Sequence, residues 1–83
     1  MSYEPTIIIK KVELDNKRSE IDREWEWKDS ERNVMQYLVN LLNYSPFEVD
    51  GIKLIICTPE LTSFNAAIRK KLHDLNIWFT TSY

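Results

Sequence analysis

The sequence is poor in glycine and cysteine. Its 83 residues include one glycine, Gly51, and one cysteine, Cys57. Loops that cradle nucleotide phosphates need several glycines, so nucleotide binding through a Rossmann or P-loop motif is excluded. A single cysteine excludes an internal disulfide and a cluster of cysteine metal ligands, and it fits a reducing compartment. We therefore expect a cytoplasmic protein that has no cofactor.

Long apolar runs and a strong excess of one charge are also lacking. Apolar runs such as 7–9 are far below the roughly 20 residues of a membrane span. Residues 1–5 lack the positive start and the apolar stretch of a signal peptide. Eleven basic and thirteen acidic residues leave a net charge of −2. This charge argues against a protein that binds phosphate backbones through its net charge. We expect a soluble protein with no membrane partner.

Large aromatic side chains are what the chain does have, with three Trp, four Tyr and three Phe. A chain of this length fits one small globular domain, residues 1–83. Such a domain buries only about 60 to 65% of the surface that its unfolded chain exposes. We therefore expect a few large side chains to provide most of its stability.

The first third of the chain predicts a β-hairpin. Residues 6–14 are rich in β-branched side chains, which is typical of a strand, and the polar segment 15–19 is turn-prone. Residues 20–28 alternate, with Ile21, Arg23, Trp25 and Trp27 on one side and mostly acidic residues on the other. This period of two predicts a half-buried second strand. The competing interpretation is a helix over 18–27, with Ile21, Trp25 and Lys28 on one face.

The remaining residues predict two helices and two strands. Asp29 or Ser30 can cap a helix that ends at Ser45-Pro46, and its apolar positions have helical spacing. These positions are Val34, Tyr37, Leu38, Leu41 and Leu42. Asp50-Gly51 indicates a turn before an apolar strand over 52–57, which is typical of a central strand. Thr58-Pro59-Glu60 starts a second helix that stops at Asn76, and 77–81 form the last strand.

This order, ββαβαβ, predicts a two-layer α+β or α/β sandwich. Two helices cover one face of a four-stranded mixed sheet and leave the other face open. Large apolar residues would lie on that open face, and such a patch usually marks a partner, a ligand or a second subunit. Ile55 and Trp78 are the candidates, depending on which of them points away from the helices.

Cys57 and His73 are the side chains best suited to chemistry. Cys57 comes just before a helix N-terminus, which could stabilise a thiolate, although a small buried hydrophobe is the simpler interpretation. His73 fits a solvated histidine near a helix C-terminus. One histidine and one distant cysteine make neither a triad nor a zinc site, so we expect no enzymatic activity.

The acidic residues gather between positions 13 and 31. On a strand, four of them would form a row on one face, about 6 to 7 Å apart. These are Glu20, Asp22, Glu24 and Glu26. The row could be a divalent-metal site, an acid/base pair or a mimic of nucleic-acid phosphates, but the simplest interpretation is a solvated face that protects an edge strand. A metal site needs ligands from several elements, so we expect none here.

Two short basic groups could contact phosphates, with aromatic side chains as stacking platforms for bases. The groups are Lys10-Lys11 and Arg69-Lys70-Lys71, and the aromatic residues are Trp25, Trp27, Trp78 and Tyr83. Packing in the core is the simpler role for the aromatic residues. The expected order of elements also differs from the βαββαβ order of an RNA-recognition module.

Taken together, these features favour a non-enzymatic protein-interaction module. Its partner would be a second copy, bound through the open sheet face or an edge strand, or a larger protein that it modulates as a small accessory or inhibitor protein. Two alternatives stay open: a nucleic-acid-binding domain, and an acidic phosphate mimic that inhibits a nucleic-acid-binding protein. An enzyme would have to rely on Cys57 or on the carboxylate row alone.

Overall fold

A single antiparallel sheet forms one layer of the protein. The computed structural model describes residues 4–44 and 47–83. The four strands lie in the order β2-β3-β1-β4, and each neighbouring pair is antiparallel. Their bounds are Thr6–Lys10 for β1, Glu48–Val49 for β2, Ile52–Ile55 for β3 and Phe79–Ser82 for β4. The expectation of a mixed sheet was therefore wrong, whereas the interior position of β3 agrees with its apolar sequence.

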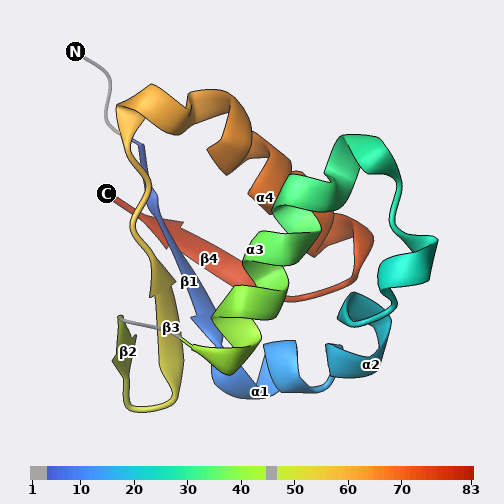
Figure 1. Cartoon of the computed structure of the whole chain (residues 1–83). Coiled ribbons are helices and arrows are strands. Elements are labelled where there is room, and N and C mark those ends of the chain that lie inside the picture. The colour runs from blue at the N-terminus through green and yellow to red at the C-terminus, as the bar shows by residue number, and fades with distance from the viewer. Residues whose placement is uncertain (1–3, 45–46) are drawn as a thin grey trace.

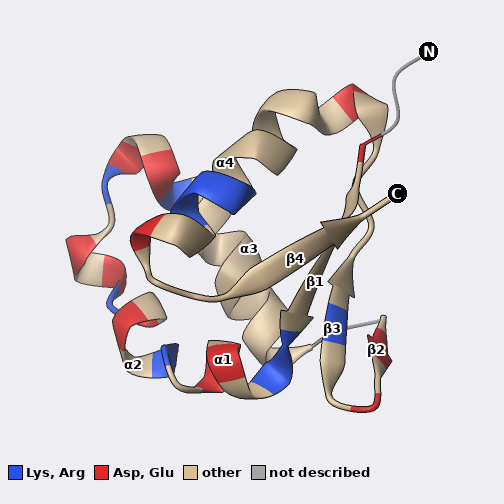
Figure 2. Ribbon diagram, turned by 180° about the vertical axis from the view of Figure 1, so that it is seen from behind, with Lys and Arg blue, Asp and Glu red and all other residues tan. Residues whose placement is uncertain are grey.

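The helices form the second layer. Figure 1 shows the two long helices, α3 and α4, on the same side of the sheet, and Figure 2 shows the sheet from its other side. Their bounds are Arg32–Asn43 for α3 and Thr62–Asp74 for α4. Two shorter helices and three 3-10 turns complete the layer: α1 (Lys11–Asp15), α2 (Arg18–Ile21), η1 (Glu24–Glu26), η2 (Asp29–Glu31) and η3 (Pro59–Leu61). Two long helices on one face agree with the prediction.

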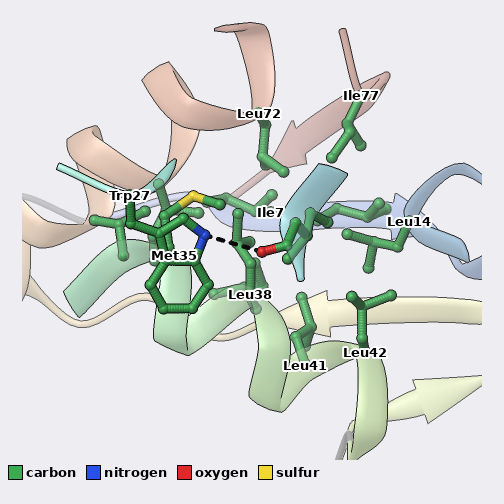
Figure 3. Packing of buried hydrophobic residues seen from close by; sticks show 14 residues of the cluster. Ile7, Leu14, Trp27, Met35, Leu38, Leu41, Leu42, Leu72 and Ile77 are labelled. Carbon is green, nitrogen blue, oxygen red and sulfur yellow. Dashed lines mark hydrogen bonds between the residues drawn. The ribbon is translucent and has the colours of Figure 1, made fainter. Parts of the chain in front are cut away.

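Residues 11–26 form three short helical segments joined by turns, so the predicted N-terminal hairpin is wrong. The first strand ends at Lys10, and α1 follows it and buries Leu14. In the segment predicted as the second strand, the indole Nε1 of Trp27 donates a hydrogen bond to the carbonyl of Ile21 at 3.0 Å and closes a tight turn (Figure 3). The competing helix over 18–27 is right only for its first turn, since α2 ends at Ile21 and Trp25 is 80% exposed.

The second strand in the chain follows α3 instead of preceding it. With the helical segments before β2 counted together, the order becomes βαββαβ, the split β-α-β arrangement of ferredoxin-like folds. RNA-recognition modules also have a four-stranded sheet with one face available for ligands. The expected difference in element order from an RNA-recognition module was therefore wrong.

The turn predicted at Asp50-Gly51 joins β2 to β3. Both residues have positive φ angles, 51° and 76°, as a two-residue type I′ hairpin turn requires. Glycine adopts this conformation without strain. The turn sets the register of the hairpin, in which Val49 lies opposite Ile52.

The hydrophobic core lies between the sheet and the helices (Figure 3). Alternation along the strands directs Ile7, Ile9 and Ile55 toward α3 and α4, and all three are buried. The predicted stripe of α3 is confirmed, with Val34, Leu38, Leu41 and Leu42 buried. Full burial of a side chain of this size contributes about 1.5 to 3 kcal/mol, so this interface contributes much of the stability.

The ends of the helices follow the predicted signals only in part. Neither Asp29 nor Ser30 makes a capping hydrogen bond, and the carboxylate of Glu31 instead accepts one from the backbone N–H of Lys28 at 3.2 Å. The predicted stop at Ser45-Pro46 lies outside the described residues. At the end of α4, Asn76 has a φ of 58°, as a C-terminal αL cap requires, which agrees with the predicted stop there.

Candidate interaction surface

The open face is the side of the sheet that points away from α3 and α4. Alternation and register place the following residues on it: Thr6, Ile8, Lys10, Val49, Ile52, Leu54, Trp78, Thr80 and Ser82. At its centre, Ile8 of β1 lies opposite both Leu54 of β3 and Thr80 of β4. Ile8 and Leu54 are each half-buried. The central strands therefore present aliphatic side chains to the surface.

Trp78 completes the open face beside the end of β1. Its side chain is 57% exposed, and the Nζ of Lys10 lies 5.7 Å from the centroid of its ring. This distance is typical of a cation–π contact. Lys10 is paired with Ile52 across the strands, and Ile52 with Val49. One rung of the sheet thus carries Val49, Ile52 and Lys10, and Trp78, which comes just before β4, lies beside Lys10.

Ile55, the other predicted interaction residue, is 2% exposed and faces the helices. Its role on an open face is therefore excluded. The face of a strand residue depends on its register with the neighbouring strands, and in β3 the residues that turn inward are Lys53 and Ile55. Ile52 and Leu54 point outward instead, and Ile56, which follows them, is 52% exposed.

Lys53 is a buried lysine that the sequence analysis did not single out. It is 3% exposed, and its Nζ donates hydrogen bonds to the carbonyls of Leu41 and Leu42, the second at 3.3 Å. These carbonyls lie in the last turn of α3, where the negative end of the helix dipole favours a cation. Arg18 reaches the same turn, with its Nη2 3.4 Å from the Leu42 carbonyl.

Burial lowers the pKa of Lys53, because it disfavours the ammonium form, and this effect outweighs the attraction of nearby acids such as Glu48. The one signal in the sequence was a single charge within the apolar run 52–57. We assign Lys53 a structural role, in which it fastens α3 to the sheet.

The predicted row of carboxylates does not exist as a row, because Glu20, Glu24 and Glu26 lie on short helical turns and Asp22 lies between these turns. Glu20 belongs to α2, whereas Glu24 and Glu26 belong to η1. Glu20 pairs with Lys17 at 3.6 Å and Glu26 with Arg23 at 3.8 Å. Within residues 4–44 and 47–83, no three His, Cys, Asp or Glu side chains come close enough to hold a metal ion.

The two basic groups lie apart. Lys10 is on the open face, whereas 69–71 belong to α4 in the helical layer, and Figure 2 shows the blue segment at the end of β1 well separated from the blue segment of α4. Lys71 is also occupied, because its Nζ lies 2.6 Å from a carboxylate oxygen of Glu31. The groups therefore do not form one continuous track for a phosphate backbone.

Cys57 packs against the hydrophobic core and His73 lies on α4, so neither belongs to the open face. The Sγ of Cys57 is 3.6 Å from the carbonyl of Ile55, and burial raises the pKa of the thiol, which keeps it protonated at neutral pH. The direction of this pKa shift is opposite to the one that a helix N-terminus produces when it stabilises a thiolate. His73 is exposed, as expected, and its ring meets that of Phe79 edge to face at 5.9 Å.

None of the described helices combines the length and the apolar character that a transmembrane span requires. Comparison with known proteins found no matching family model, no matching curated protein and no matching solved structure. The open face and the contacts around it are therefore the basis for a functional proposal.

Proposed function

We propose that the protein is a non-enzymatic interaction module that binds a protein partner through its open face. The observation that supports this most is the aliphatic centre of that face, formed by Ile8 and Leu54 on neighbouring strands. A contiguous apolar surface in a protein of this size is the usual mark of a binding site. From the single cysteine, we also propose that the module works in the cytoplasm.

Trp78 is the proposed anchor of this interface. Interfaces are enriched in aromatic residues, and tryptophan is prominent among the residues that dominate binding energy. Among the described residues of the open face, Lys10 is the one charged residue, and its ammonium lies over the indole of Trp78. A partner that covers Trp78 would therefore bury a large ring without having to desolvate many charges.

Nucleic-acid binding is the second candidate, since the βαββαβ order and the pair of Lys10 and Trp78 both suit it. RNA-recognition modules stack bases on aromatic side chains of the sheet, whereas here the central positions are Ile8 and Leu54. We therefore rank it below protein binding. An electrophoretic shift assay over a salt series tests it, because phosphate contacts weaken steeply as salt rises.

The phosphate-mimic hypothesis has lost its main support. It depended on the regular spacing of a strand, and the four carboxylates lie on α2, on η1 and between them. Two of them, Glu20 and Glu26, are also in ion pairs with basic neighbours.

The proposal is tested by affinity capture from the native host with the wild type and two tryptophan variants. Trp78→Glu introduces a charge on the open face, and Trp25→Glu makes the same change at an exposed site on η1. We expect Trp78→Glu to lose the captured partner and Trp25→Glu to keep it. Loss of an interface tryptophan typically costs about 2 kcal/mol or more. Equal capture by both variants would contradict the proposal.

A further inference from the structure

The outer edge of β4 is the second exposed feature of the sheet. The sheet has two edge strands, β2 and β4. Proteins usually protect such edges with charged residues, proline or very short strands. β2 has this protection, since it is two residues long and includes Glu48. β4 does not, because residues 77–83, Ile-Trp-Phe-Thr-Thr-Ser-Tyr, include no charged residue and no proline.

The direction of the backbone groups in the sheet follows from two hydrogen bonds outside the regular ladders. The N–H of Leu54 donates to the carbonyl of Phe47 at 2.9 Å, so the backbone groups of Leu54 point toward β2. The N–H of Lys11 donates to the carbonyl of Gly51 at 2.8 Å. In an antiparallel sheet the backbone groups of successive residues point to opposite sides. Ile55 and its partner Ile7 therefore bond to each other, between β3 and β1.

The same alternation extends to β4. Ile8 must direct its N–H and C=O toward β4, where its partner is Thr80. Thr80 therefore bonds to β1, and the backbone groups of its neighbours, Phe79 and Thr81, point away from the sheet. Within residues 4–44 and 47–83, the outward donors and acceptors of these two residues have no partner at the β4 edge.

We propose that a second copy of the chain pairs with this edge, strand β4 against strand β4, in antiparallel orientation. The two-fold axis passes through Thr80, which then faces Thr80 of the second copy. Phe79 of each copy exchanges backbone hydrogen bonds with Thr81 of the other copy. This register keeps the open faces of both copies on the same side, so one sheet runs through the dimer.

The chemistry of the edge favours an identical partner. Around a two-fold axis each residue meets its own equivalent or a near neighbour, so a charged strand would repel itself. The segment 77–83 avoids this repulsion, and pairs of threonine residues across strands are favourable. A hollow of about 550 Å³ lies beside the strand, lined by His73, Asn76 and residues 77–81, and it leaves room for the incoming strand.

Solution mass over a concentration series, measured by light scattering, is the first test. We expect the wild type to form a dimer and Thr81→Pro to weaken it roughly tenfold or more, because proline removes the outward N–H and leaves the bonds of Thr80 to β1 in place. Thr81→Val keeps the N–H and should dimerise like the wild type. A monomeric wild type at every concentration would overturn the proposal.

Charge at the two-fold axis is the second test, and it does not depend on how well the proline variant folds. Thr80 is exposed, so it tolerates substitution. We expect Thr80→Lys and Thr80→Glu each to be monomeric, because like charges would meet across the axis, with dimerisation weakened roughly 100-fold. An equimolar mixture of the two should form a heterodimer. No dimer in the mixture, or full dimerisation of each variant alone, would overturn the proposed register.

The edge and the open face can be tested separately. This proposal goes beyond the open face and does not rest on it. Val49→Glu places a charge on the open face at the far side of the sheet from β4, where Val49 is 59% exposed. It should leave the dimer intact. Loss of the dimer in Val49→Glu, with the dimer intact in Thr81→Pro, would overturn edge pairing and would show that copies associate through their open faces.

Discussion

The ammonium of Lys10 lies over the indole ring of Trp78, 5.7 Å from its centroid, at one corner of the open face. The same chain buries another tryptophan, Trp27, which is 8% exposed and hydrogen-bonded to the carbonyl of Ile21. Two residues of one type thus have opposite roles. Trp27 closes the helical segment onto the core, whereas Trp78 is available to a partner.

Alanine substitutions should separate these two roles. We expect Trp27→Ala to lower the free energy of unfolding by about 3 to 5 kcal/mol, because it leaves a cavity in the core. Trp78→Ala should lower it by less than about 1 kcal/mol, since only a surface cation–π contact is lost. Chemical denaturation followed by circular dichroism measures both values. A larger loss in Trp78→Ala would mean that Trp78 belongs to the core.

Replacing Asn76 with glycine should stabilise the protein. Its N–H donates to the carbonyl of His73 at 3.0 Å, and the N–H of Ile77 to that of Leu72 at 2.8 Å, as in a Schellman motif. Because Asn76 has a positive φ, Asn76→Gly should raise the unfolding free energy by roughly 0.5 to 1 kcal/mol. The same change within α3, Asn40→Gly, should lower it by a similar amount. Thermal unfolding measures both variants. If both substitutions stabilise the protein, or both destabilise it, the assignment of Asn76 as an αL cap is contradicted.

The ion pair between Glu31 and Lys71 should stabilise the protein at neutral pH and lose this effect at acidic pH. The hydrogen bond from Lys71, at 2.6 Å, lowers the pKa of Glu31 below its ordinary value of 4.5. The stabilisation is therefore complete above pH 4.5 and is lost as the pH falls through the lower, folded-state value. At pH 7, Glu31→Gln should cost about 1 to 2 kcal/mol.

Glu20→Gln is the matched control, because the pair of Glu20 and Lys17 is more exposed and 3.6 Å long. It should change the unfolding free energy by less than about 0.5 kcal/mol. Denaturant titrations of both variants at neutral pH and near pH 3 check the prediction. Equal costs in the two variants at pH 7 would show that Glu31 contributes no more than a surface charge.

Lys53 should affect stability at alkaline pH. Burial lowers its folded-state pKa below the ordinary value of 10.5, so between these two values the unfolded state binds more protons and stability rises with pH. Lys53→Met removes this dependence and should cost about 1 to 2 kcal/mol at pH 7, because the carbonyls of Leu41 and Leu42 lose a donor. The difference between wild type and variant should widen as the pH approaches 10.5. If the difference in unfolding free energy does not change with pH, the assignment of Lys53 as a buried ammonium is contradicted.

The part of the fold from α3 onward, apart from β2, could be predicted because its signals are local. The stripe of α3, the turn at Asp50-Gly51 and the stop at Asn76 each depend on a few consecutive residues. Residues 20–28 could not be predicted, because their charges match a period of two while the deciding contact is the hydrogen bond of Trp27 to Ile21. β2 was missed because two residues show no periodicity.

The number of helices was enough to predict an open face. The sequence did not show which residues lie on it. Trp78 is on it, whereas Ile55 is on the opposite side, and a shift of one residue in the assignment of a strand is enough to exchange the two faces. The inward direction of Lys53 depends in the same way on its pairing with Ile9. Such pairings between distant segments leave no local signal.

Oxidative footprinting of the tryptophans in an extract of the native host tests the proposed function most directly. Trp78 and Trp25 are both exposed in the isolated chain, at 57% and 80%, so hydroxyl radicals should label both. With the partner present, we predict that labelling of Trp78 falls and labelling of Trp25 stays the same. Unchanged labelling of Trp78 in an extract that protects Trp25 would contradict the open face as the binding surface.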